Sequence, residues 1–140
     1  MDQQKQQEIM LKLSLYEQQM QQIQQQLQLV EQSTAELTSL DIGLDDLKGS
    51  KGKEIMAPIG RGIFIKSKLI SEELIVDIGG KNFVKKSIAE TKKLIEVQIK
   101  KLEEVKENLT SSLEEINNQM IRLIMQAQAE AQKSEDIKKK

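Results

Sequence analysis

Apolar residues recur at alternating steps of four and three along the first part of the chain. Such a seven-residue repeat keeps one seam of a helix facing a partner helix. Glutamines fill much of the space between the seam residues, and glutamine is a good helix former. The alternative, a disordered low-complexity tract, is disfavoured because the apolar spacing continues through the glutamines. The sequence predicts a coiled-coil helix over residues 1–43, ended by Gly43. Its seam is Ile9, Leu13, Tyr16, Met20, Ile23, Leu27, Val30, Thr34 and Leu37.

The last part of the chain repeats the pattern. Ser87 followed by Glu90 is typical of a capping box at a helix start. Lysines interrupt this seam twice, and a lysine can lay its stem along a seam while its ammonium group stays in water. We therefore expect a second coiled-coil helix over residues 87–132 and a flexible tail over 133–140. The second seam is Ile88, Lys92, Ile95, Ile99, Leu102, Lys106, Leu109, Leu113, Ile116, Met120, Leu123 and Ala127.

The segment between the helices, residues 44–86, has a different pattern. It contains the only proline and both phenylalanines. Its short β-branched runs favour strands, and glycine and proline mark the turns between them. A polar linker should lead into two β-hairpins, with turns at Pro58–Gly62 and Gly79–Asn82. The expected strands are Glu54–Ala57, Gly62–Lys68, Leu74–Ile78 and Asn82–Lys85.

Two seams on either side of one short insert predict an α+β fold. The economical topology is a single structural domain: a long antiparallel coiled-coil hairpin, with two β-hairpins inserted between its helices and both termini at the opposite end. An isolated β-hairpin is marginally stable in water because no second layer covers its apolar face. We therefore expect the hairpins to assemble with those of other subunits.

Composition and charge exclude several classes of function. The chain has 21 basic and 22 acidic residues, and only 2% of its residues are aromatic, which disfavours nucleic-acid binding. It has no histidine and no cysteine, so general acid–base and thiol chemistry lack their usual groups. Gly60-Arg61-Gly62 and Gly80-Lys81 are better explained as turns than as phosphate loops. We expect no enzyme, cofactor or metal site. With no apolar run of about 18 residues and no signal peptide, we expect no membrane association and a cytoplasmic protein.

Apolar residues also lie beside the seams near the expected free end. Periodicity alone leaves two interpretations open: a contact with a third helix or tolerated fraying on one hand, and a binding surface on the other. Methionine favours a binding surface slightly, because its flexible side chain adapts to partners of different shape. The candidate binding residues are Leu11, Leu15, Ile121, Ile124 and Met125.

The order helix, two hairpins, helix resembles the prefoldin alpha class. The specific part of the resemblance is the segment from Glu54 to Lys66, EIMAPIGRGIFIK. Val76-Asp77-Ile78-Gly79-Gly80 and Val84-Lys85-Lys86-Ser87 are similar to the third and fourth strands of that family. The absence of histidine and the preference for lysine over arginine suit an archaeal member.

The resemblance implies an ATP-independent holdase chaperone. The family forms hexamers of two alpha-type and four beta-type subunits, whose hairpins build a central double β-barrel. Unfolded clients are held at the coiled-coil tips and passed to a group II chaperonin. The five candidate binding residues would hold the client. The competing hypothesis is a structural coiled-coil or filament-forming scaffold without client transfer. Assembly through the barrel would depend on Ile55, Ile63, Ile65, Val76, Ile78 and Val84.

Overall fold

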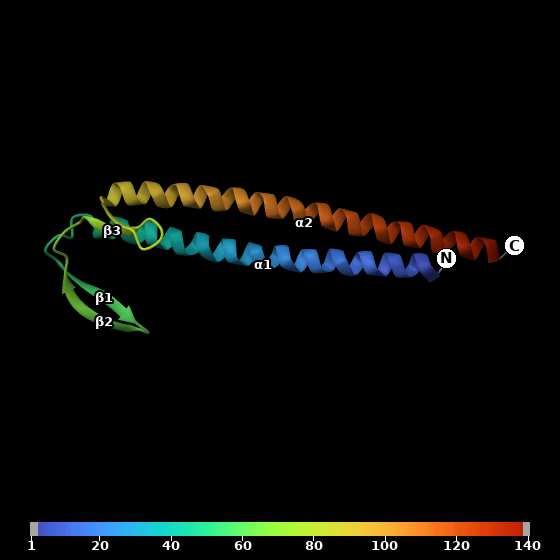
Figure 1. Ribbon diagram of the computed structural model, residues 1–140, viewed down its shortest axis with the longest axis horizontal. Helices are drawn as coiled ribbons and strands as arrows, with labels where there is room; N and C mark the ends of the chain where they lie inside the picture. The colour runs from blue at the N-terminus through green and yellow to red at the C-terminus, as the bar shows by residue number, and fades with distance from the viewer. Residues whose placement is uncertain (1–2, 139–140) are drawn as a thin grey trace. The chain divides into compact units, whose positions relative to one another are not determined.

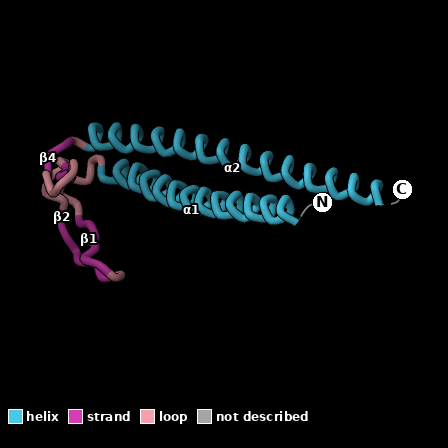
Figure 2. Tube along the Cα trace, turned by 45° about the vertical axis from the view of Figure 1, so that its right-hand side comes forward, coloured by secondary structure: helices cyan, strands magenta, loops and turns pink. Residues whose placement is uncertain are grey.

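The computed structural model describes residues 3–138, with side chains described as far as Lys133. Two long helices enclose four short strands in the sequence (Figure 1), and the strands form two antiparallel hairpins (Figure 2). The predicted fold class is confirmed. The elements are α1 (Gln3–Leu47), β1 (Glu54–Gly60), β2 (Ile63–Lys68), β3 (Leu74–Asp77), β4 (Phe83–Lys86) and α2 (Ile88–Lys138).

The chain divides into two compact units. The helical unit comprises the described parts of Met1–Gln32 and Glu103–Lys140, and the hairpin unit comprises Ser33–Leu102. Each unit contains a segment of both helices, and the four strands all belong to the hairpin unit.

In the helical unit the two helix segments run antiparallel. Lys5 Nζ lies 4.0 Å from Glu130 Oε1, and Lys106 Nζ lies 3.7 Å from Glu31 Oε1. Every predicted seam residue of this unit is half-buried, with the single exception of Lys106, which is exposed. No residue among the described side chains of this unit is fully buried. The two helix segments thus partly bury the seam between them, and most of the remaining helix surface is exposed to solvent.

The hairpin unit contains the buried core. Leu44 on α1 and Ile88 and Ile95 on α2 are 5–6% exposed. The start of α2 is fixed by Ser87, whose Oγ accepts a hydrogen bond from the backbone N–H of Glu90 at 3.1 Å. This confirms the capping role of Ser87. The half-buried residues Leu37, Leu47, Leu74 and Ile99 pack around the core.

The two central residues of each hairpin turn have positive φ. These are Arg61 (φ 48°) and Gly62 (77°) in the first hairpin, and Gly80 (62°) and Lys81 (62°) in the second. Positive φ at both central residues is the requirement of a type I′ turn, whose twist matches that of paired strands. Each sheet described in the structure has two strands, so both of its edges are unpaired.

Three predicted boundaries differ from the structure by more than one residue. Gly43 does not end the first helix, because Leu44 and Leu47 beyond it reach the core and α1 continues to Leu47. β1 continues through Pro58 to Gly60 with an irregularity in pairing, so the first turn is shorter than predicted. α2 extends to Lys138, where a flexible tail was predicted from residue 133; residues 139–140 lie outside the described residues.

Candidate functional site

The five candidate binding residues all lie on the open surface of the helical unit. Their exposed fractions run from 42% for Ile124 to 64% for Leu11. Met10, which directly follows the seam residue Ile9 and is 70% exposed, belongs to the same apolar surface, although it is not one of the five candidates. Large apolar side chains that stay in water are available for contact with another molecule.

The six candidate assembly residues divide into two groups. Ile63, Ile65 and Ile78 are exposed, whereas Ile55, Val76 and Val84 are half-buried. Val76 and Val84 pair with each other across the second hairpin. Successive residues of a strand point to opposite faces of the sheet, so Val76 and Val84 share a face with Leu74. Leu74 packs against the core of the same chain.

The outward face of the second hairpin was missed by the sequence interpretation. Ile75 is 71% exposed and Phe83 is 62% exposed. The signal was available in the alternation of β3, where Leu74 and Val76 point one way and Ile75 and Asp77 the other.

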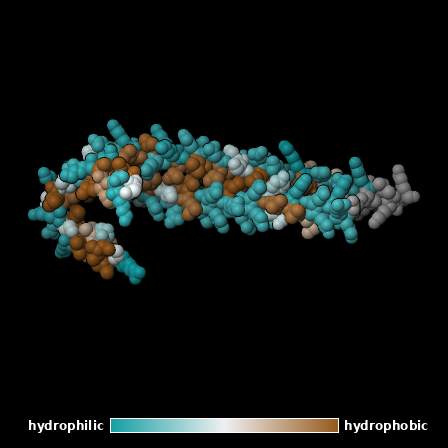
Figure 3. All heavy atoms as spheres, viewed as in Figure 1, coloured by the Kyte–Doolittle hydropathy of each residue, from teal (hydrophilic) through white to brown (hydrophobic). Residues whose placement is uncertain are grey.

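The first hairpin exposes large apolar side chains on both faces. Met56 and Phe64 occupy one face, and Ile63 and Ile65 occupy the other. Figure 3 shows this apolar surface gathered on the hairpin at the lower left of the view. A two-stranded sheet with no covering layer on either face requires a partner to bury its apolar area.

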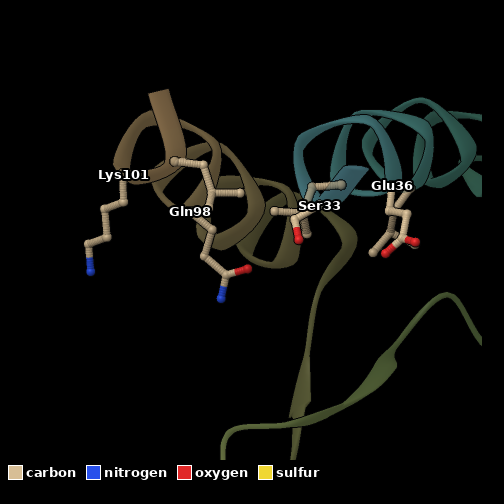
Figure 4. A pocket seen from close by; sticks show the side chains of 7 residues that line it. Ser33, Glu36, Gln98 and Lys101 are labelled. Carbon is tan, nitrogen blue, oxygen red and sulfur yellow. The ribbon is translucent and has the colours of Figure 1, made fainter. Parts of the chain in front are cut away.

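An apolar groove runs between the helix segments of the hairpin unit. It has a volume of about 560 Å³, with Leu37, Leu40 and Leu102 as its apolar lining. Ser33 and Glu36 on α1 and Gln98 and Lys101 on α2 form its polar rim (Figure 4). A second hollow of about 420 Å³ shares Leu37, Leu40 and Gln98 and reaches Val76 and Ile78. With no histidine or cysteine in the chain, this lining offers a hydrophobic contact surface and no acid–base pair near neutral pH.

A charged cluster interrupts the seam in the hairpin unit. Lys92 Nζ lies 2.6 Å from Asp45 Oδ1 and 3.9 Å from Asp41 Oδ1, and the Lys92 side chain is only 17% exposed. The hydrogen bond from Lys92 lowers the pKa of Asp45, and the same bond raises the pKa of Lys92. A polar pair in a seam favours the alignment of the two helices that satisfies it.

The Lys92–Asp45 pair should make the loss of thermal stability on replacing Lys92 depend on pH. Because the pKa of Asp45 is lowered from 3.8, its contribution is present above that value and is lost as the pH falls through the lower folded pKa. Because the pKa of Lys92 is raised from 10.5, its contribution is lost only as the pH rises above that value. The difference in thermal midpoint between the wild type and Lys92→Met should be constant near neutral pH and should shrink in strong acid.

Thermal unfolding followed by circular dichroism from acid to neutral pH would test this. Lys93→Met removes the same charge from an exposed position and controls for net charge. If the thermal midpoints of the wild type and Lys92→Met differ as much in strong acid as at neutral pH, Asp45 is not the partner that stabilises the fold.

Among the described residues, no three acidic side chains come together in a group that could hold a metal ion. No helix in the described part of the chain combines the length and apolar character needed to cross a membrane.

The arrangement defines a class of protein: a subunit with paired helices, uncovered β-hairpins and exposed apolar residues beside the helix seam. Residues 16–133 match the Prefoldin subunit family. Prefoldin subunit alpha of Methanobrevibacter smithii is 35% identical over 127 residues, which cover 90% of this chain and 87% of that protein. Prefoldin subunit alpha of Methanosphaera stadtmanae is 34% identical over 95 residues, which cover 68% of this chain and 69% of the relative.

A solved structure has the same fold. It is a filamentous prefoldin from Methanocaldococcus jannaschii determined by cryo-electron microscopy, with a TM-score of 0.73 and 22% identity, covering 81% of this chain and 96% of that one. The chain therefore belongs to the prefoldin subunit family, on its alpha side. Prefoldins are chaperones and not enzymes, which agrees with a surface that offers apolar contact in place of catalytic groups.

Proposed function

We propose that this chain is a subunit of a cytoplasmic, ATP-independent holdase chaperone. It captures non-native polypeptides through Leu11, Leu15, Ile121, Ile124 and Met125, and a group II chaperonin receives the captured clients. The observation that carries the proposal is that these residues are large, apolar, exposed and outside the seam that joins the helices. They have no role in holding the subunit together and remain free for a client.

Weak contacts of this kind suit a holdase. Burying one such side chain is worth ~1.5–3 kcal/mol, so each contact alone is easily reversed. Several subunits that bind the same client at once multiply these contacts into a useful affinity without a fixed sequence preference. Met125 adds an adaptable side chain to the surface.

The proposed complex contains two of these chains and four beta-type subunits. Exposed apolar residues on both hairpins, together with their unpaired edges, support assembly through this region. Ile55, Ile63, Ile65 and Ile78 would contribute to the shared barrel directly. Val76 and Val84 would contribute by holding the second hairpin against its own helices.

Replacing Ile124 and Met125 together with serine should remove most of the suppression of client aggregation. The change deletes two exposed apolar contacts and spares the seam residues Met120 and Leu123. Light scattering from a chemically unfolded client, diluted into buffer with the complex, measures the effect. The mass of the complex should be unchanged, which separates a loss of binding from a loss of assembly. Full protection by the variant complex would refute the assignment of these residues.

A filament-forming or scaffold role is the second candidate. Its support is the pair of hairpins with uncovered apolar faces, which a second copy could cover as well as a different subunit. Size exclusion with light scattering, on the chain alone and mixed with a beta-type prefoldin subunit, distinguishes the two. A defined species of two and four chains on mixing supports the holdase, and large polymers that ignore the partner support the filament.

A further inference from the structure

The charged cluster of the hairpin unit consists of Asp41 and Asp45 on α1 and Lys92 on α2. Lys92 is a seam residue, and Asp41 continues the seam of α1 four residues after Leu37. The side chains of Asp41 and Lys92 are only 24% and 17% exposed. Asp41 Oδ1 is fully buried and accepts no hydrogen bond from the described residues. Lys92, whose Nζ lies 3.9 Å away, therefore supplies the charge that balances a carboxylate largely removed from water.

Apolar residues enclose the charged cluster along both helices. On α1, Leu37 and Leu44 lie one turn to either side of Asp41. On α2, Ile88 and Ile95 lie one turn to either side of the lysine. All four apolar residues belong to the buried core or pack against it. A charge that loses its partner in this setting costs far more than an unpaired charge at the surface.

The apolar residues alone do not specify how α1 and α2 are aligned. A slip of one seven-residue repeat moves one helix about 10 Å along the other. Leu37 and Leu44 are one repeat apart on α1, and Ile88 and Ile95 are one repeat apart on α2. An apolar residue of one seam therefore still meets an apolar residue of the other seam after the slip.

The charged cluster does distinguish these alignments. After a slip of one repeat in one direction, Lys92 would face Thr34 and Thr38 in place of the two aspartates. After the opposite slip it would face Lys48 and the linker beyond α1. A slip of half a repeat would leave Lys92 beside at most one of its two carboxylates. The observed register is thus the one that gives this lysine both partners.

We infer that the charged cluster fixes the register of α1 against α2 in the hairpin unit, and that it does so without adding stability over an apolar layer. Asp41, Asp45 and Lys92 are positioning residues in this sense. Taking two charges out of water offsets most of their attraction, so a well-packed apolar pair at the two seam positions is at least as stable. Such an apolar pair would not reject a slipped alignment.

The register also places the second hairpin. β4 ends at Lys86 and α2 begins at Ile88, so the hairpin is joined to α2 through Ser87 alone. A slip of α2 along α1 would therefore move the hairpin, and with it the inward-facing Leu74, relative to Leu44 of the core. The charged cluster thus determines which part of α1 the hairpin covers.

Two matched double variants of the full chain test the inference. Asp41→Leu with Lys92→Leu replaces the seam charges with an apolar pair and leaves the net charge unchanged. Glu31→Leu with Lys106→Leu is the control, because it removes an ion pair between the helices whose side chains are more than 50% exposed. The control also leaves the net charge unchanged, so the two variants differ in the burial of the pair that each removes.

The register is measured as the distance between nitroxide labels on Ser33→Cys and Gln98→Cys, by electron paramagnetic resonance. The chain has no cysteine of its own, and these exposed positions on α1 and α2 line one hollow. The control should give the same single distance as the labelled chain without further changes. Asp41→Leu with Lys92→Leu should give at least one further population, from helices displaced by about 10 Å for a slip of one repeat.

Thermal unfolding of the same chains separates register from stability. Lys92→Leu alone strands both aspartates and should lower the thermal midpoint by about 5 °C or more. Adding Asp41→Leu should restore the midpoint to that of the wild type or above. A single distance in the leucine double variant, a midpoint that stays below the wild type, or an equal spread of distances in the exposed control would each overturn the inference.

Discussion

Replacing Ile75 and Phe83 together with aspartate should abolish assembly of the subunit while leaving its helices folded. Both side chains point outward from the second hairpin and are more than 60% exposed, so the chain alone gains nothing from them. In an assembled barrel they would be buried, and a buried carboxylate without a partner is strongly unfavourable. Size exclusion with light scattering after mixing with beta-type subunits measures the loss, and circular dichroism confirms that the helices remain.

Lys85→Ala is the matched control, because Lys85 pairs with Ile75 across the same outward face. It should assemble as the wild type does. Val76→Asp provides a contrast, since Val76 faces the helices of its own chain and its replacement should destabilise the isolated subunit. Normal assembly of the Ile75 and Phe83 double variant would show that the outward face of this hairpin is not an interface.

Truncating Ile95 to alanine should lower the free energy of unfolding by about 2–4 kcal/mol. Ile95 is 5% exposed and is one of the three apolar residues that form the core of the hairpin unit, so its loss leaves a cavity that few neighbours can fill. Urea denaturation followed by circular dichroism measures the change. Val97→Ala on the same helix, at a position 51% exposed, should shift stability by no more than about 0.5 kcal/mol. Similar losses from the two variants would mean that the core does not limit stability.

The seams were predicted from the sequence almost residue by residue. Alternating steps of four and three are enough to choose one side of a helix. The side chosen is half-buried in α1 and, apart from Lys106, half-buried or buried in α2. Lys106 was expected to keep its ammonium group in water, and it does so beside Glu31. The two hairpin turns were also predictable from the sequence, because Gly62 and Gly80 occupy positions that require positive φ.

Two of the misses, the end of the first helix and the outward face of the second hairpin, share one physical cause. Gly43 was expected to end the first helix because glycine fills the C-cap position without strain. In the structure the helix continues, because burial of Leu44 beyond Gly43 outweighs the cost of about 1 kcal/mol for a glycine inside a helix. The alternation in β3 separates Leu74 and Val76 from Ile75, yet it does not say which set meets the helices. Which face meets the helices depends on how the hairpin packs against them. That packing is set by tertiary contacts between residues that are distant in the sequence. The sequence therefore supplied the faces and left their partners undetermined.

The antiparallel pairing of the helices also sets the order in which contacts can form. Leu44 and Ile88 are separated only by the linker and the hairpins, whereas Lys5 and Glu130 are separated by almost the whole chain. Closing the shorter loop costs less entropy, so helix pairing should begin at the core and spread toward the chain ends. Contacts at the ends should then be the last to form and the first to open. A subunit built this way can open at its ends while its core stays folded.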